Sequence, residues 1–294
     1  MKKLNDENEL RNIIRKNYLE ILNREPDEDG LNHYLTQMKK GKITSDDLRK
    51  IFMNSQEYKY LQLVKLRNPD LPISERMKRD WDDRANTDAK FFIRAVYNQN
   101  EHEFWESGKT ERDNILGNNS KRYDLITDGK NPKEMKVLEI GCGIGRILIP
   151  MATIFGEAVG VDVSSEMIKI SQKHVKKISN CKIFENNGSD LSMFPDNYFD
   201  FCYSYIVFQH IPEKAIVKNY IKEVSRILKS GKIFRFQVHG DYDKNPTDGT
   251  TWNGVHFTSH EMHQIANESK FVILEEEGQN DRYYWLTFKS IKNA

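Results

Sequence analysis

The sequence predicts an α/β fold in which an all-helical N-terminal part precedes a mostly parallel β-sheet. From residue 133 onward, strand-like apolar runs alternate with helix-like segments, which is typical of parallel strands joined by crossover helices. Before residue 67, apolar residues recur at helical spacing only. We therefore expect a small helical domain at 1–66, a linker and helical lead-in or lid at 67–132, and an α/β domain at 133–294.

The composition favours an ordinary globular protein. Lys and Arg number 45 and Asp and Glu number 44, so the net charge is +1 and gives no sign of a nucleic-acid or membrane partner. No apolar run approaches the roughly 18 residues of a membrane span, and the start MKKLNDENEL lacks the apolar core of a signal peptide. We expect a cytoplasmic protein with buried, unpaired cysteines.

Four short helices are expected in the first 66 residues. Apolar spacing marks helices at 10–22 and 31–38, and Gly41 can end the second. Thr44 or Ser45 can cap a third helix, and Ser55 a fourth. The core positions expected in the third helix are Leu48, Ile51 and Phe52. The acidic stretch 25–30 does not make an EF-hand, because Thr36 stands where that loop needs a bidentate Glu.

This N-terminal pattern resembles a known domain. The matching residues are Tyr18-x-x-Ile21-Leu22-x-Arg24-x-Pro26-Asp27-x-x-Gly30, then Tyr34, Gly41 and Ser55-x-Glu57-Tyr58. They resemble a small helical domain of unknown function that is often attached to bacterial surface-layer and glycan-modifying proteins. The resemblance implies a glycan-related context. A generic bundle that only packs against a partner or a second copy stays open.

The remaining elements follow in order. Residues 75–116 read as helix, and seven strands are expected at 136–140, 157–161, 181–185, 199–206, 232–238, 271–276 and 283–289. Helices are expected near 145–155, 165–177, 213–228 and 259–268. Thr258 and Glu261 form a capping box for the last helix. Only residues 277–282 separate the last two strands, so these two strands can form an antiparallel hairpin but not a parallel pair.

The segment 136–146, Lys-Val-Leu-Glu-Ile-Gly-Cys-Gly-Ile-Gly-Arg, is the most informative stretch of the chain. A buried strand breaks there into a turn with glycines at alternate positions, where backbone can approach a ligand closely. The pattern resembles motif I of the class I S-adenosylmethionine (SAM)-dependent methyltransferases. That resemblance implies a Rossmann-like seven-stranded sheet, SAM as cofactor and S-adenosylhomocysteine as product. We expect Arg146 to pair with a local carboxylate rather than with the ligand.

Three further segments match the same family in order. Asp162 ends a strand and can accept hydrogen bonds from ribose hydroxyls. Asp190 and Leu191 stand where the family meets adenine, and 198–212 resembles its FD…S…H-x-P segment. The resemblance implies cofactor-binding roles for Glu139, Gly141, Gly143, Gly145, Asp162, Val163, Asp190, Leu191, Tyr205, Arg84 and Trp105.

Candidate catalytic residues are histidines just past two strands, where open α/β sheets place ligands. Removal of the acceptor's proton needs a nearby base, and we predict His239 or His256 for this role, with His210 as a further candidate. A purely structural role for His210 stays open. Tyr97 and Trp252 are expected to shape the acceptor site. We predict no metal, since no Cys or paired acid completes the His256, His260 and His263 spacing.

The expected function is methylation of a small polar acceptor, most specifically a sugar hydroxyl of a surface glycan or its precursor. A small-molecule or protein N-methyltransferase is an alternative, although the double-Glu loop of arginine enzymes and the (N/D)-P-P-(Y/F) motif of DNA enzymes are both missing. A degenerate methyltransferase fold that only binds a partner is the non-enzymatic alternative. The N-terminal domain can serve a homo-oligomer or a partner protein.

Overall fold

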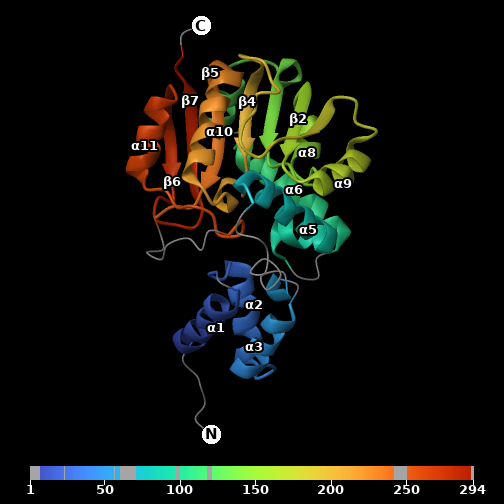
Figure 1. The fold of residues 1–294 in the computed structure, drawn as a ribbon, viewed down its shortest axis with the longest axis vertical. Coiled ribbons are helices and arrows are strands. Elements are labelled where there is room, and N and C mark those ends of the chain that lie inside the picture. Colours follow the sequence, from blue (N-terminus) through green and yellow to red (C-terminus); the bar gives the residue numbers. More distant parts are fainter. Residues whose placement is uncertain are drawn as a thin grey trace. The chain divides into compact units, whose positions relative to one another are not determined.

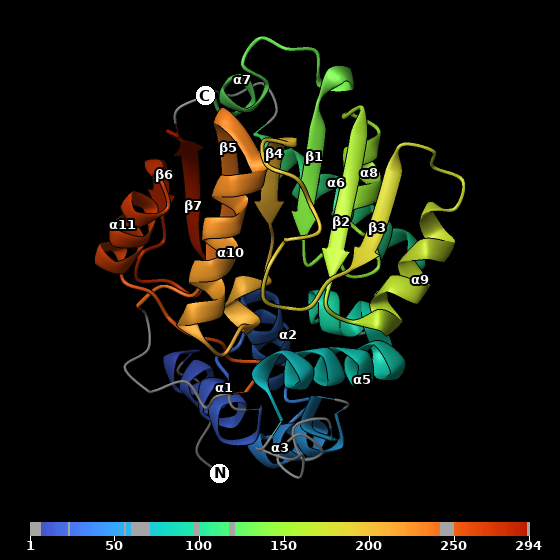
Figure 2. The same ribbon diagram turned by 45° about the horizontal axis from the view of Figure 1, so that its top comes forward.

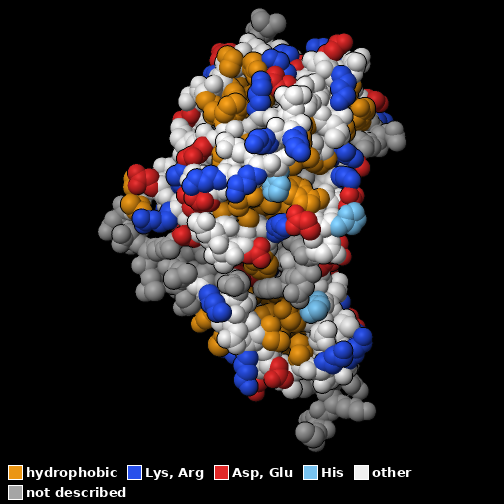
Figure 3. Space-filling model, turned by 90° about the vertical axis from the view of Figure 1, so that its right-hand side faces the viewer, with side chains coloured by type: hydrophobic (Ala, Val, Ile, Leu, Met, Phe, Trp, Pro, Cys, Tyr) orange, Lys and Arg blue, Asp and Glu red, His pale blue; other side chains and the backbone are white. Residues whose placement is uncertain are grey.

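The structure is a computed structural model that describes residues 7–22, 24–55, 57–59, 71–96, 100–117, 121–241 and 250–292 (Figure 1). The chain forms two compact units, Met1–Leu71 and Pro72–Ala294. Thus the predicted lead-in from residue 72 onward belongs to the same unit as the sheet. On the face in Figure 3, Lys and Arg side chains are interspersed with Asp and Glu on both units, in keeping with the net charge of +1.

The first unit contains α1 (Glu7–Leu22), α2 (Glu28–Lys39) and α3 (Ser45–Asn54) around one apolar core. Asp27 caps α2 by accepting from the Gly30 amide, and Thr44 forms a capping box with Asp47 at α3. Leu48 and Phe52 are buried as predicted, but Ile51 is 41% exposed, so its expected core position is wrong. Most of the predicted fourth helix lies outside the described residues.

The second unit contains a seven-stranded sheet. Its strands are β1 (Lys136–Ile140), β2 (Glu157–Asp162), β3 (Cys181–Glu185), β4 (Phe199–Ser204), β5 (Leu228–Val238), β6 (Phe271–Glu277) and β7 (Tyr284–Ser290). The order is β3-β2-β1-β4-β5-β7-β6, in which the first five strands are parallel and β7 runs antiparallel to both neighbours. The predicted mostly parallel sheet with an antiparallel C-terminal hairpin is confirmed.

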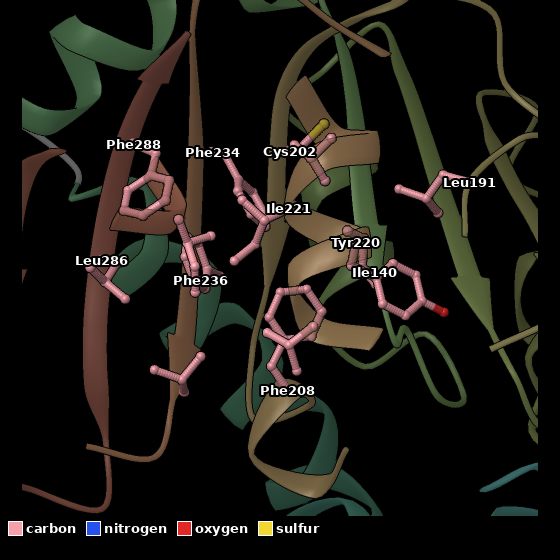
Figure 4. Packing of buried hydrophobic residues seen from close by; sticks show 14 of the residues in the cluster. Ile140, Leu191, Cys202, Phe208, Tyr220, Ile221, Phe234, Phe236, Leu286 and Phe288 are labelled. Atoms are coloured by element: carbon pink, nitrogen blue, oxygen red, sulfur yellow. The ribbon is translucent and has the colours of Figure 1, made fainter. Parts of the chain in front are cut away.

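Helices cover both faces of this sheet, because successive strand residues point to opposite sides. One face packs against α10 (Lys214–Ile227) and α11 (Ser259–Glu268), and Figure 4 shows the aromatic centre of that core. Phe234 and Phe236 stack there with ring centroids 4.4 Å apart. The other face packs against α6 (Glu101–Leu116), α7 (Lys121–Thr127), α8 (Leu148–Ala152) and α9 (Ser165–Val175).

Helix α5 (Ile73–Arg94) lies beyond the carboxyl ends of the parallel strands (Figures 1 and 2). Asp82 of α5 accepts hydrogen bonds from the Ser164 hydroxyl and the Glu166 amide, at the N-terminus of α9. These contacts hold α5 beside the end of β2, because a carboxylate satisfies the free N–H groups of a helix start. The expected helix 75–116 is wrong as a single element: α5 ends at Arg94, Ala95 follows it in the left-handed region at φ 54°, and Asn100 caps α6.

Three smaller boundaries also differ from the prediction. β4 ends at Ser204, so residues 205–206 leave the sheet, and the helix after the glycine turn is only α8. β5 begins at Leu228 and includes the expected 228–232 turn. Gly231 takes φ 72° there, and the register between β4 and β5 shifts, so a bulge replaces a separate turn.

Candidate active site

A pocket opens at the carboxyl ends of β1, β2 and β4, and α5 covers one side of it. The position is where the connections from neighbouring strands run in opposite directions, the usual ligand site of open α/β sheets. The pocket encloses about 940 Å³ including its mouth. Its lining comprises Met77, Trp81, Phe92, Ile93, Glu139, Ile140, Gly141, Cys142, Gly143, Arg146, Ile147, Asp162, Val163, Met167, Asn186, Gly188, Tyr205, Ile206, Val207, His210, Ile211 and Tyr220.

The glycine turn after β1 brings bare backbone to the pocket wall. Gly141 has φ 76°, and a Cβ there would lie 2.3 Å from Cγ2 of Val207. Gly143 has φ 52°, and its amide donates to Oδ2 of Asp162 at 2.8 Å. The Ser164 amide donates to Oδ1 at 2.9 Å. Asp162 is thereby fixed at the end of β2, and each of its oxygens keeps a lone pair for a ligand hydroxyl.

Glu139 is a buried carboxyl in the pocket lining. It faces Tyr203 across the β1–β4 pairing and accepts a hydrogen bond from the Tyr203 hydroxyl at 2.8 Å. Burial raises the pKa of Glu139 to about 8, and burial likewise raises the pKa of Asp162 to about 6. Ionising either carboxyl in the free protein therefore costs free energy. A ligand that brings a positive charge or hydrogen-bond donors to these carboxyls can offset that cost.

Arg146 also lines the pocket, with only 5% of its surface exposed. Its Nη1 donates to the Ser107 hydroxyl of α6 at 3.0 Å, and its guanidinium carbon lies 5.7 Å from the centroid of the Tyr205 ring. Within the described parts of the chain, no carboxylate oxygen lies within 4.0 Å of its nitrogens. Arg146 therefore makes no direct ion pair of the kind expected, although the Glu111 and Glu139 carboxylates oppose the lowering of its pKa by burial.

His210 is the one candidate catalytic histidine that lines the pocket. Its Nδ1 lies 2.7 Å from the Trp252 carbonyl oxygen. Because a carbonyl only accepts, Nδ1 carries the proton and Nε2 is left as the basic nitrogen. Burial and the nearby Arg84 charge hold the pKa of His210 well below its usual range, so the ring is neutral at pH 7.

A buried network fixes the segment that carries Trp252. Arg84 of α5 donates to the Thr251 carbonyl at 3.1 Å and to the Thr251 hydroxyl at 3.0 Å, and that hydroxyl donates to Asp80 at 2.6 Å. The Arg84 guanidinium also lies over the rings of Trp81 and Trp252, 4.4 and 5.1 Å from their centroids. Arg84 does not line the pocket, so its contacts support a structural role, and cofactor binding by it stays a prediction.

The other predicted base candidates lie next to each other and outside the pocket lining. The His239 and His256 rings are 5.2 Å apart, and the two residues form an isolated parallel bridge. His239 is fully buried, its Nδ1 lies 2.9 Å from the Arg282 carbonyl oxygen, and burial lowers its pKa to about 3. Neither histidine lines the pocket, which favours His210 as the base.

Several other predicted site residues also lie outside the lining. Asp190 accepts from the Asn187 side chain and the Ser192 amide, and Leu191 is fully buried in the core. Trp105 donates to Glu101 and packs on His174. Gly145 and Trp252 are not among the lining residues, although the Trp252 ring contacts the His210 ring at a 5.2 Å centroid distance. Tyr97 lies outside the described residues. The site roles of these residues stay predictions.

Sequence reasoning missed several lining residues. Asn186 and Gly188, rather than Asp190, come from the turn after β3, and α5 contributes Met77. Ile206 takes φ 54°, a strained conformation for a β-branched residue, and its amide donates to the Gln237 side chain at 3.1 Å. Glycine would have signalled this turn in the sequence, whereas isoleucine gave no signal.

Two absences concern metals and membranes. Within the described ranges, no three His, Cys, Asp or Glu side chains are placed to hold a metal ion together. No described helix has the length and apolar character needed to cross a bilayer.

Each unit contains a segment that matches a known family model. Residues 138–236 match the family model described as a methyltransferase domain, and residues 3–62 match a domain of unknown function (DUF4214). A demethylmenaquinone methyltransferase of Staphylococcus carnosus is 31% identical over 102 residues, covering 34% of this chain and 41% of the relative. A ubiquinone biosynthesis O-methyltransferase of Pelagibacter ubique is 29% identical over 122 residues, covering 42% and 48%. The chain thus spans less than half of each relative.

Solved structures agree on the fold. Magnesium protoporphyrin IX methyltransferase from Synechocystis PCC 6803 with bound SAM has a TM-score of 0.55 at 14% identity, covering 76% of this chain and 100% of that one. The pocket fits the same cofactor, because it combines a glycine turn in close approach, a buried acid at the end of β2 and buried groups of both charges. The chain therefore carries a class I SAM-dependent methyltransferase domain, preceded by the domain of unknown function.

Proposed function

We propose that this protein transfers the methyl group of SAM to a hydroxyl oxygen of a small acceptor, a sugar of a surface glycan or its precursor. The observation that carries the hydroxyl acceptor is the state of His210, which lines the pocket with Nδ1 engaged by a carbonyl and Nε2 available to take a proton. The sugar rests on the resemblance of the N-terminal domain to domains on glycan-modifying proteins.

The residues of the pocket divide the work between binding and proton removal. SAM, when bound, supplies an electrophilic methyl group. Asp162 accepts from the ribose hydroxyls, and the backbone at Gly141 admits the methionine part. His210 takes the hydroxyl proton at Nε2 as the acceptor oxygen attacks. The apolar rings of Trp81 and Phe92 line the pocket and exclude water from it. The acceptor oxygen can then lie in line with the methyl group of the donor without competing water molecules.

A hydroxyl on a planar ring is the second candidate acceptor. The names of the relatives from Staphylococcus carnosus and Pelagibacter ubique refer to quinone methylation. The aromatic residues Trp81, Phe92 and Tyr205 in the lining favour a flat ring as well. Both candidates use the same base, so they differ only in the acceptor group.

Labelled SAM distinguishes these functions. Cell extract from a strain that lacks the protein is incubated with the purified chain and SAM carrying a labelled methyl group. We expect label in O-methyl sugars after hydrolysis of the glycan fraction, whereas label in the lipid-extractable quinone fraction supports the second candidate. Label on nitrogen, or no label from a chain that binds S-adenosylhomocysteine, contradicts the proposal.

Two histidine variants test the base. His210→Gln is expected to lower the rate about 100-fold or more while S-adenosylhomocysteine binding changes little, because general-base catalysis contributes roughly 10²–10⁴. His256→Gln, outside the pocket lining, is the matched control and is expected to keep most of the activity. An unchanged rate for His210→Gln removes it from the mechanism.

A further inference from the structure

The imidazole ring of His210 lies against two indole rings. The Trp252 ring lies 5.2 Å away between centroids, tilted by 32°, and the Trp81 ring of α5 lies 5.4 Å away in an edge-on arrangement at 72°. The backbone beside His210 is fixed as well, because the Gly254 amide donates to the Gln209 carbonyl at 2.7 Å. Together with the hydrogen bond from Nδ1 to the Trp252 carbonyl, these contacts fix the orientation of the imidazole from α5 and from the segment after β5.

Arg84 of α5 contacts both of these indole rings and the backbone next to one of them. Its guanidinium carbon lies 4.4 Å from the centroid of the Trp81 ring and 5.1 Å from that of Trp252. The guanidinium also donates to the carbonyl and the hydroxyl of Thr251. Both kinds of contact are possible at once because a guanidinium stacks through its planar faces and donates hydrogen bonds from its edge. Arg84 is fully buried and does not line the pocket, so it acts on His210 only through these neighbours and through its charge.

The charge of Arg84 opposes a proton on His210. Burial lowers the pKa of His210 most, and the Arg84 guanidinium lowers it further. His239 at the end of β5 and Arg282 in the turn between β6 and β7 act in the same direction with smaller effects. Asp80 is the carboxylate on α5 that belongs to the same hydrogen-bond network as Arg84. A proton on Nε2 would place a second positive charge beside a buried guanidinium, which favours the uncharged ring.

We propose that Arg84 is a positioning residue for methyl transfer, which keeps His210 in its uncharged Nδ1–H form by fixing the two indole rings and by opposing a proton on Nε2. Its part in methyl transfer rests on the proposed function, because only an uncharged Nε2 can take the hydroxyl proton. As the acceptor oxygen bonds to the methyl carbon, the C–S bond breaks with its electron pair on sulfur and the proton passes to Nε2. The repulsion from Arg84 then favours release of that proton to solvent before the next cycle.

Nitrogen chemical shifts of the His210 ring in the full chain, bound to S-adenosylhomocysteine, test this inference. They are recorded from pH 8 down to the lowest pH at which the complex stays folded, and His210→Gln assigns the signals. Wild type is expected to keep Nε2 unprotonated throughout. Arg84→Gln removes the charge but keeps an amide that can donate to Thr251, and its His210 is expected to protonate within this range, about one pH unit or more above wild type. The same protonation behaviour in both proteins overturns the inference.

Asp80→Asn is the matched control, because it alters the same network but keeps the guanidinium. Its His210 is expected to stay uncharged over the whole range. If His210 protonates at the same pH in Asp80→Asn and Arg84→Gln, the network has only a structural role and the inference is overturned. If Arg84→Gln does not fold, the double variant Asp80→Asn with Arg84→Gln removes both charges together and is read in the same way. Arg84→Lys keeps the charge but not the planar fork, and is expected to leave the ring uncharged with a smaller share of the Nδ1–H form.

Transfer of labelled methyl groups from SAM to cell extract at pH 6 and pH 8 connects the state of the ring to the reaction. Wild type is expected to lose little rate at pH 6, whereas Arg84→Gln is expected to lose about threefold or more, because its His210 becomes protonated. An unchanged rate for His210→Gln means that the proposed base has failed. A strongly reduced rate for His210→Gln, together with wild-type pH dependence in Arg84→Gln, means that only the role of Arg84 has failed.

Discussion

At the scale of single residues, the backbone of Gly141 in the turn after β1 packs directly against the side chain of Val207. Gly141→Ala places a Cβ at φ 76° and 2.3 Å from Val207. We expect at least tenfold weaker S-adenosylhomocysteine binding and a lower melting temperature, because Val207 lines the pocket and must move. Calorimetry and thermal unfolding measure both effects.

Gly231 provides the control for that prediction. It has φ 72°, but a Cβ added there would meet no other part of the protein within 4 Å, and the residue lies outside the pocket lining. Gly231→Ala is expected to cost about 1 kcal/mol of unfolding free energy and no affinity. Equal affinities of the two alanine variants for S-adenosylhomocysteine would contradict the account of the turn.

Glu139 makes binding depend on pH. With a pKa of about 8, it is mostly protonated at pH 7 in the free protein. A ligand ammonium favours the carboxylate, so binding releases a proton, and affinity should rise with pH and level off near pH 8, by up to about tenfold per unit below that value. Calorimetry from pH 6.5 to 8 in buffers of different ionisation enthalpy measures the release. Glu139→Gln, or methylthioadenosine as ligand, should remove this dependence.

The site could be predicted at residue scale only where chemistry leaves a sequence pattern. Gly141, Gly143 and Asp162 follow from a motif because the backbone conformation demands glycine and the strand end demands an acid. Arg146 could not be assigned, since sequence does not show which carboxylates come near it. Ile206 holds a left-handed conformation through tertiary contacts, which override its local preference.

At the scale of elements, α5 is joined to the segment after β5 by the Asp80–Thr251–Arg84 network. Thr251→Val removes the hydroxyl, and we expect a loss of about 1–2 kcal/mol of unfolding free energy, since both hydrogen bonds of the hydroxyl involve charged groups. Because Trp252 follows Thr251, we also expect the Nδ1–H form of His210 to lose its dominance. Nitrogen chemical shifts of the His210 ring in the S-adenosylhomocysteine complex report this directly.

Thr251→Ser is the conservative comparison. It keeps the hydroxyl that Asp80 and Arg84 contact, and so should keep both the stability and the His210 tautomer close to wild type. A serine variant that behaves like the valine variant would mean that methyl packing, and not the hydrogen bonds, holds this segment.

Element boundaries could be predicted where caps and turns are explicit. The Thr258 capping box and the Asn100 cap are readable residue types, although the break between α5 and α6 was missed because apolar spacing continues across 91–104. The reason for a glycine at position 108 becomes visible only in the folded structure. A Cβ there would lie 2.0 Å from the Arg146 carbonyl oxygen, so only glycine lets α6 pack against the cofactor turn.

At the scale of the whole molecule, the pocket is built entirely from the second unit, since all its lining residues follow Leu71. We expect a fragment of residues 72–294 to bind S-adenosylhomocysteine within about twofold of the full chain, as measured by calorimetry. A fragment that stays folded but loses this affinity would show that the first unit contributes to the cofactor site.

The antiparallel hairpin at the end of the sheet could be predicted because the connection between its two strands is short. Residues 277–282 cannot span a parallel crossover, so the final strands had to be antiparallel. The insertion of β7 between β5 and β6 was not predicted, because local patterning does not state which edge a hairpin joins.

The position of β7 between β5 and β6 also sets the order in which the sheet can be completed during protein synthesis. β6 leaves the ribosome before β7, yet in the described sheet it pairs only with β7. Until β7 has been synthesised and has paired with β5, the edge of β5 has no partner strand on that side. Phe236 also lacks its ring contact with Phe288 during this time. The strands that line the pocket are thus synthesised before the strand that completes the aromatic core. Between these two events the exposed β5 edge and aromatic side chains are a surface to which a chaperone can bind.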